Sequence, residues 1–232
     1  MYAKCAILSR RLILRITMAS DYSPLEERAN AFSHGLGILL ALAGMGYLWQ
    51  QALQAQLSPL HSASLLLYGA SLVLLFSCST LYHTLAHTQA KSFLKTLDHC
   101  AIFILIAGTY TPTLLALNTE LAYWLLAIIW GLAIAGVLLK LKFVYRFKRL
   151  SLTVYLIMGW LALVAAYQLW DRMPAEVLLW LLAGGIAYSI GAVFYAAKQL
   201  KFGHAVWHLF VLLGAACHYL AVTHLVPLYG AS

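Results

Sequence analysis

The chain has 232 residues, of which 63% are hydrophobic and only 9% charged, and its formal net charge is +8. This composition, with a mean hydropathy of +0.84, excludes a soluble globular domain and requires a lipid environment. The apolar runs are continuous and lack the alternation of a membrane barrel, so the predicted fold class is all-α, a bundle of seven transmembrane helices. The basic residues flank apolar runs, which excludes nucleic acid as a partner and gives them a role in membrane orientation.

The first segment of the chain is basic. Residues 1–22 contain three arginines, and their apolar stretch is too short and too interrupted for a signal peptide. Because Met18 is an alternative start, we expect this segment to be either disordered or not translated. Residues 23–232 are then a single membrane domain with short loops.

Seven runs of about 20 apolar residues follow in chain order. Their predicted positions are 32–53, 62–85, 98–118, 121–140, 151–170, 175–197 and 204–227. Of the 15 lysines and arginines, 14 fall on the amino-terminal side of alternate connections, and Arg172 falls on the other side. The positive-inside rule therefore predicts a cytoplasmic N-terminus and an external C-terminus.

The first helix is predicted to begin ahead of its apolar run. Residues 23–26 (SPLE) have the form of a capping box with proline at the first helical position. Glu26, Asn30 and His34, at i, i+4 and i+8, then follow one helical stripe. They are candidates for polar residues at the mouth of a site, although His34 can equally hydrogen-bond to a neighbouring helix.

Three predicted spans bring polar side chains to the same end of the bundle. His83 lies at the cytoplasmic end of the second span, with Ser79 one turn earlier on the same face. Asp98 opens the third span. His204 and His208 open the seventh, and their i, i+4 spacing directs both rings toward one point. Histidines that merely pack in the core would not be expected to coincide in this way.

Zinc is the economical explanation for this coincidence. Zinc accepts imidazole nitrogen, and a catalytic zinc typically has three protein ligands and a fourth position for water. We therefore expect Zn2+ on His83, His204 and His208, with Asp98 and Ser79 hydrogen-bonded around them. Asp98 would be the general base, although a role as helix cap or as partner of a nearby lysine is equally open. Taken alone, the His-x3-His spacing is a weak signal, because it lacks the glutamate of an HExxH motif.

The remaining polar positions are expected to lie outside the metal site. His218 shares the inner face of the seventh span without reaching the metal, His99 points away from Asp98, and two further histidines, His87 and His224, are interfacial. The cysteines show no CxxC spacing and are expected to be free thiols. They are Cys5, Cys78, Cys100 and Cys217.

One helix distortion is predicted, at Pro112 in the third span. A proline inside a helix frees backbone carbonyls, and Thr109 and Thr111 can bond to them. No matching broken helix appears in the other half of the chain, which argues against a transporter.

At these residues the sequence resembles the haemolysin III family, the bacterial branch of the progestin and adipoQ receptor (PAQR) family. The resemblance extends from Tyr22 over nearly the whole chain. It rests on residues 26–35 (EERANAFSHG), 79–83 (STLYH), 97–102 (LDHCAI), 107–112 (AGTYTP) and 204–208 (HAVWH). The sequence also resembles the wider superfamily, whose members share a Ser-x3-His motif, an Asp and a His-x3-His motif around an intramembrane zinc. Here the residues that match this pattern are Ser79, His83, Asp98, His204 and His208. The resemblance implies seven helices, a cytoplasmic N-terminus in the bacterial inner membrane, and hydrolysis of a lipid amide.

Three functions are compatible with these features. The first is a zinc-dependent hydrolase acting on a lipid amide or ester that enters from the bilayer. The second is a non-enzymatic homeostasis or receptor-like protein in which zinc is structural. Cytolysis by pore formation is the least favoured, because the chain has no water-soluble form that could reach another cell. Membrane lipid is the expected partner, and assembly into a homo-oligomer is left open.

Overall fold

The computed structural model describes residues 22–144, 146, 148–197 and 199–230, a range that includes only Tyr22 of the basic segment 1–22. Within this part the chain is helical and contains no strand. The helices are α2 (Pro24–Gln54), α3 (Pro59–Thr84), α4 (Lys91–Leu117), α5 (Glu120–Phe143), α6 (Lys148–Trp160), α7 (Ala166–Arg172), α8 (Ala175–Ala196) and α9 (Gly203–Leu225), with 3-10 turns η1 (Leu161–Ala165) and η2 (Val226–Gly230).

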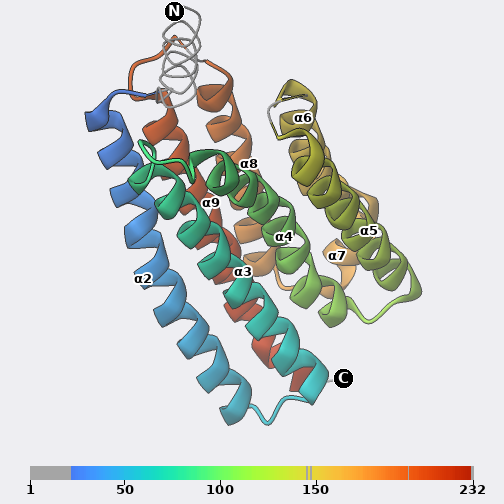
Figure 1. Cartoon of the computed structure of the whole chain (residues 1–232). Helices are drawn as coiled ribbons and strands as arrows, with labels where there is room; N and C mark the ends of the chain where they lie inside the picture. The colour runs from blue at the N-terminus through green and yellow to red at the C-terminus, as the bar shows by residue number, and fades with distance from the viewer. Residues whose placement is uncertain (1–21, 145, 147, 198, 231–232) are drawn as a thin grey trace, which may run out of the picture.

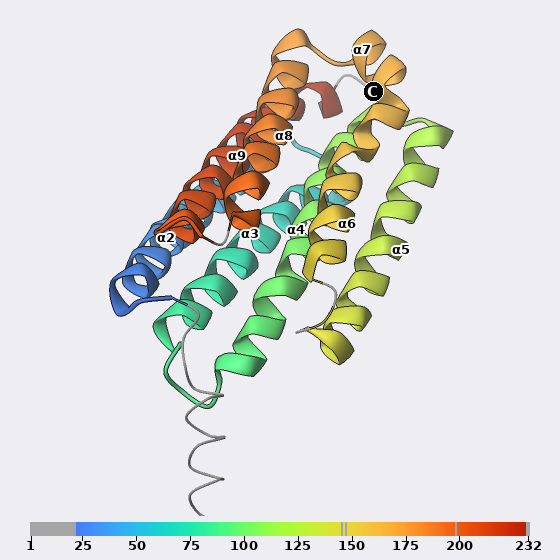
Figure 2. The ribbon, with the colours of Figure 1, turned by 90° about the horizontal axis from the view of Figure 1, so that it is seen from above.

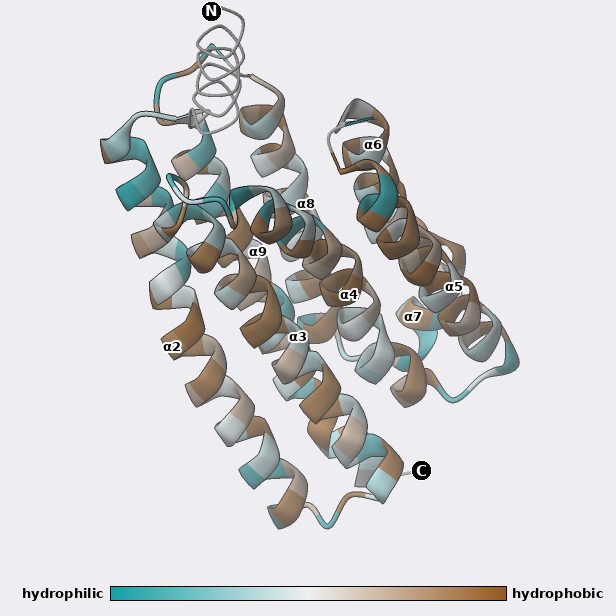
Figure 3. Cartoon of the chain, viewed as in Figure 1, coloured by the Kyte–Doolittle hydropathy of each residue, from teal (hydrophilic) through white to brown (hydrophobic). Residues whose placement is uncertain are grey.

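The predicted all-α bundle is confirmed. Among the described residues, seven helical segments are long and apolar enough to cross a membrane, with α6, η1 and α7 together supplying the fifth. Apolar residues cover the middle of the helices, whereas polar residues gather at helix ends, notably at the start of α2 (Figure 3). The chain is therefore a multi-pass membrane protein.

Helices that follow one another in the chain pack side by side, and α9 returns against α2 (Figure 1). Helices α5 and α6 lie together at one flank, where both contact α4 (Figure 2). The described chain begins at one end of the bundle and finishes at the other, as an odd number of spans requires (Figure 1). This arrangement places the beginnings of α2 and α9 beside the end of α3.

The start of α2 is fixed by the predicted capping box. The backbone N–H of Ser23 donates to Glu26 Oε2 at 2.9 Å, and the N–H of Glu26 donates to Ser23 Oγ at 3.3 Å. The second carboxylate oxygen, Glu26 Oε1, accepts a hydrogen bond of 2.8 Å from the backbone N–H of Phe202. Glu26 thus ties the first helix to the loop that precedes α9.

The fifth span differs from the prediction of one continuous helix over residues 151–170. It breaks after Trp160 into η1 and then α7. The Tyr110 hydroxyl lies at this break, where it accepts from the N–H of Ala162 at 2.7 Å. It also lies 2.9 and 2.8 Å from the carbonyl oxygens of Met158 and Gly159, to which its O–H donates. A buried hydroxyl therefore replaces helical hydrogen bonds here, which hydropathy alone cannot reveal.

Helix α4 continues through Pro112. The hydroxyls of Thr109 and Thr111 each donate to the carbonyl four residues earlier, at 2.8 Å. The carbonyl opposite the proline is that of Gly108, however, so neither threonine replaces the particular bond that the proline removes. The threonines stabilise the turns next to Pro112 rather than the turn at the proline itself.

Close packing of α8 against α9 depends on glycine. A Cβ atom at Gly184 would lie 2.1 Å from Cδ2 of His218, and one at Gly191 or Gly214 would meet an aromatic side chain at 2.8 Å. Small residues of this kind let membrane helices approach closely. His218 is held in this contact, and its Nε2 donates to the carbonyl of Leu181 at 3.2 Å.

Candidate metal centre

Three histidines meet near one end of the bundle, beneath the loop before α9. His83 comes from the last turn of α3, and His204 and His208 come from the first turns of α9. One ligand nitrogen from each lies within 4.8 Å of the others, and Nε2 of His83 is 3.2 Å from Nε2 of His204. His83 and His208 are buried. The three residues predicted as ligands are thus close enough together to hold a metal ion.

The other ring nitrogen of each histidine is occupied by protein. Metal-binding histidines usually bond through their second nitrogen to a carboxylate, a carbonyl or a hydroxyl, which fixes the ring and its tautomer. The Nδ1 partners are Glu27 Oε2 for His83 at 2.6 Å, the Asn30 carbonyl for His208 at 3.2 Å, and the Tyr22 hydroxyl for His204 at 3.0 Å.

The Nε2 atoms are the ones that remain for a metal. His208 Nε2 is buried and has no hydrogen-bond partner in the described part of the chain. Leaving such an atom unpaired costs free energy, and a metal ion would supply its partner. Three imidazole nitrogens with ordered outer partners suit a metal such as zinc.

The carboxylate beside His83 is Glu27, which the sequence reasoning missed in favour of Glu26. Glu27 is only 4% exposed, whereas Glu26 bonds to the N-cap of its own helix and to Phe202. At about 100° per residue, Glu27 lies only about 20° around the helix from His34, while Glu26 lies about 80° away. A stripe drawn at i, i+3 and i+7 through Glu27, Asn30 and His34 would have identified Glu27.

Helix α2 supplies further polar contacts to the cluster. Asn30 is fully buried, with its side-chain Nδ2 3.4 Å from His83 Nδ1. Ser33 Oγ lies 3.2 Å from His208 Nδ1. Tyr22 stacks on the His204 ring, with a centroid separation of 4.6 Å. Sequence reasoning did not single out Ser33, and it left Tyr22 in the N-terminal segment.

Asp98 lies beside the cluster. It is 4% exposed, and its carboxyl group is within electrostatic range of His83 and next to Ser79. Ser79 Oγ is buried and makes no hydrogen bond of standard geometry in the described chain. Helix α4 begins two turns earlier than predicted, at Lys91, so Asp98 lies inside the helix and is not its cap.

His99 is closer to Asp98 than its helical angle predicted. Its Nδ1 donates to the Lys95 carbonyl at 2.8 Å and lies 3.7 Å from Asp98 Oδ2. The two other histidines that were expected to be interfacial, His87 and His224, are exposed. Neither belongs to the cluster.

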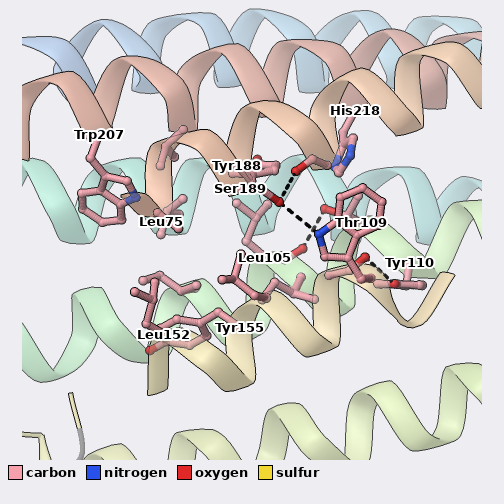
Figure 4. A pocket seen from close by; sticks show the side chains of 18 of the residues that line it. Leu75, Leu105, Thr109, Tyr110, Leu152, Tyr155, Tyr188, Ser189, Trp207 and His218 are labelled. Atoms are coloured by element: carbon pink, nitrogen blue, oxygen red, sulfur yellow. Dashed lines mark hydrogen bonds between the residues drawn. The ribbon is translucent and has the colours of Figure 1, made fainter. Parts of the chain in front are cut away.

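A cavity lies between α4, α6, α8 and α9, and Asp98 and His34 are among its lining residues. Its wall is mainly apolar, with Trp207 and Tyr155 among the aromatic side chains that face it (Figure 4). A second cavity shares with it part of its wall, including Tyr110, Trp160 and His218. The two cavities are therefore neighbours beside the break in the fifth span.

Comparison with known proteins gives concordant matches. A family model described as Haemolysin-III related matches residues 22–219. The chain is 43% identical over 198 residues to the Hemolysin-3 homolog of Bacillus subtilis (strain 168), covering 85% of this chain and 92% of that protein. It is 44% identical over 200 residues to Hemolysin-3 of Bacillus cereus, with coverages of 85% and 90%. The human monocyte to macrophage differentiation factor is 31% identical over 206 residues, with coverages of 85% and 83%.

Proposed function

Because the chain belongs to the haemolysin III family of PAQR-type membrane proteins, we propose that it is a zinc-dependent membrane hydrolase acting on a lipid amide or ester. The observation that carries this proposal is the cluster of three histidines with occupied Nδ1 atoms, adjoining a carboxylate that also lines an apolar cavity. We further propose a cytoplasmic N-terminus, which the distribution of lysine and arginine supports, and a location in the bacterial inner membrane, which the similarity to the Bacillus proteins supports.

In this proposal His83, His204 and His208 hold the metal through Nε2. Zinc, when bound, would lower the pKa of a water molecule and polarise a carbonyl group. Glu27 holds His83 in the tautomer that leaves Nε2 unprotonated, and the Asn30 carbonyl does the same for His208.

Asp98 is the proposed base. It is the carboxylate in the cavity wall, and it lies close to His83 without belonging to the ligand set. A carboxylate in this position can take up the proton of an attacking water and return it to the leaving group. Ser79, beside Asp98, would orient the carboxyl group.

The cavity supports a lipid substrate. Its wall between α4, α6, α8 and α9 is lined by leucine, isoleucine and aromatic side chains, which suit an acyl chain. Asp98 and His34 are polar groups at the end nearest the histidines. A lipid lying with its chain among the apolar residues would therefore bring its polar linkage toward Asp98.

The alternative function is that of a non-enzymatic homeostasis or receptor-like protein with structural zinc. One observation favours it: none of the three histidines lines the cavity, and residues such as His34, Asp98 and Trp207 stand between the apolar space and the cluster. The word hemolysin in the names of the relatives describes those proteins, and cytolysis is the least favoured function for this chain.

Replacing Asp98 with asparagine separates the two main functions. The amide keeps the shape of the carboxyl group but cannot take up a proton, so hydrolysis of a lipid amide should fall by about two to four powers of ten while zinc content and thermal stability are largely kept. Asp171→Asn, at an exposed carboxylate, is the matched control and should leave turnover unchanged.

If the protein is instead non-enzymatic and its zinc structural, no hydrolysis is expected. Wild-type protein with stoichiometric zinc would then show no hydrolysis of ceramides, acyl-amines or phospholipids above a metal-stripped control. Such a result would exclude the hydrolase and leave zinc with a structural role.

A further inference from the structure

His34 is a buried histidine in the cavity wall whose ring nitrogens are unpaired. The residue is 1% exposed, and its ring stacks on His208 at a centroid distance of 3.6 Å and an interplanar angle of 7°. Phe76 packs against it edge-on. Neither Nδ1 nor Nε2 makes a hydrogen bond of standard geometry in the described chain.

An unpaired buried imidazole needs an explanation. A neutral ring has one N–H donor and one acceptor nitrogen, and leaving such groups unpaired in the interior costs on the order of 1–3 kcal/mol. One face of the His34 ring is covered by His208, and a hydrogen-bond partner of either nitrogen has to approach the edge of the ring. The cavity provides that approach, because His34 is one of its lining residues.

Several other polar side chains of the cavity are already engaged. Trp160 Nε1 donates to Ser189 Oγ at 3.0 Å, and Ser189 donates in turn to a backbone carbonyl. Tyr110 bonds to the backbone at the break of the fifth span, and Tyr155 donates to the carbonyl of His99. His34 differs from these residues in facing the cavity with its hydrogen-bonding capacity unused.

We propose that His34 is a positioning residue that donates a hydrogen bond to the carbonyl oxygen of the lipid in the cavity. Most of the wall is apolar and several of its other polar side chains bond within the protein, so the carbonyl of an amphiphile with a single acyl chain would be drawn toward His34 and Asp98. This inference rests on the proposed function, because it takes the lipid assigned to the cavity as the occupant. It requires neither hydrolysis nor a change in the charge of His34.

The test compares two ligands that differ only in a carbonyl group. A photoreactive single-chain lipid labels the cavity of the full-length zinc-loaded protein in nanodiscs, and unlabelled competitors displace it. The competitors are a long-chain methyl ketone, which has a carbonyl that cannot be hydrolysed, and the alkane of equal length. Wild type should prefer the ketone by about fivefold to tenfold, the contribution of one buried hydrogen bond.

Two substitutions at His34 isolate its hydrogen bond. His34→Phe keeps a ring stacked on His208 but removes both nitrogens, so the preference for the ketone should vanish while zinc content is kept. His34→Gln restores a donor and should restore part of the preference. His87→Phe, at an exposed histidine outside the cavity, is the matched control and should behave as wild type.

The outcomes separate the role of His34 from lipid binding in the cavity, on which that role depends. An equal preference for the ketone in wild type and His34→Phe would overturn the role of His34 and leave lipid binding standing. Labelling that neither competitor reduces in wild type would overturn the lipid-binding function together with this inference. Metal-stripped wild type must keep its preference, and loss of preference there would assign the effect to the metal.

Discussion

The buried contact between Glu27 and His83 gives a quantitative prediction for zinc affinity. Glu27 Oε2 accepts from His83 Nδ1 at 2.6 Å, and the two residues are 4% and 1% exposed. A hydrogen bond to a charged group contributes about 1.5–3 kcal/mol, against about 0.5–1.5 kcal/mol for a neutral pair. Glu27→Gln keeps an acceptor but loses the charge, so we expect a loss of about 1.4 kcal/mol, or about tenfold in zinc affinity.

Glu27→Ala removes the acceptor as well, and zinc affinity should then fall by up to about a hundredfold. The matched control is Glu26→Gln, because Glu26 is the adjacent carboxylate and bonds to Ser23 and Phe202 instead of a histidine. Zinc affinity is measured by competition with a chelator of known affinity on purified protein. An unchanged affinity in Glu27→Gln, or an equal loss in Glu26→Gln, would refute the assignment of Glu27 as the outer partner.

Three further predictions concern topology and packing. A reporter active only outside the cytoplasm should be active when fused after Ser232 and silent when fused after Arg149; the reverse pattern would overturn the orientation. Gly184→Ala forces a Cβ to within 2.1 Å of the His218 ring and should lower unfolding stability by about 1–3 kcal/mol in a thermal melt, whereas Gly131→Ala, with nothing within 4 Å, should be neutral or stabilising. Tyr110→Phe leaves the Ala162 N–H without its acceptor and should cost about 1–3 kcal/mol, while Tyr123→Phe, whose exposed hydroxyl bonds to Asn118, should cost little in the same melt.

Features that depend on long apolar runs or on spacing within one helix could be predicted from the sequence. The number of spans and the helical class follow from long apolar runs, because lipid permits few other ways to satisfy the backbone. The start of α2 follows from local chemistry at residues 23–26. The pairing of His204 with His208 follows from helical spacing, and their meeting with His83 follows from their shared depth in the membrane.

Features that depend on rotation or on distant contacts could not be predicted in this way. A stripe drawn through Glu26 instead of Glu27 has a plausible spacing, and only the packing of α2 on α3 decides between them. The break after Trp160 occurs in a segment as apolar as its neighbours, and it is stabilised by Tyr110 from another span. The contact of Tyr22 with His204 joins residues 182 positions apart, for which local sequence gives no signal.

The origin of the metal ligands in distant parts of the chain has a consequence for biogenesis. His83 and His204 are separated by 121 positions, so α3 is synthesised long before its partner helix. At a typical rate of about 5–20 residues per second, the first ligand would wait roughly 6–24 s for the second. Glu27 and Asn30 on α2 would wait still longer beside an incomplete cluster. The cluster is thus completed only when α9 has joined the bundle, and metal uptake would mark the chains in which that helix is in place.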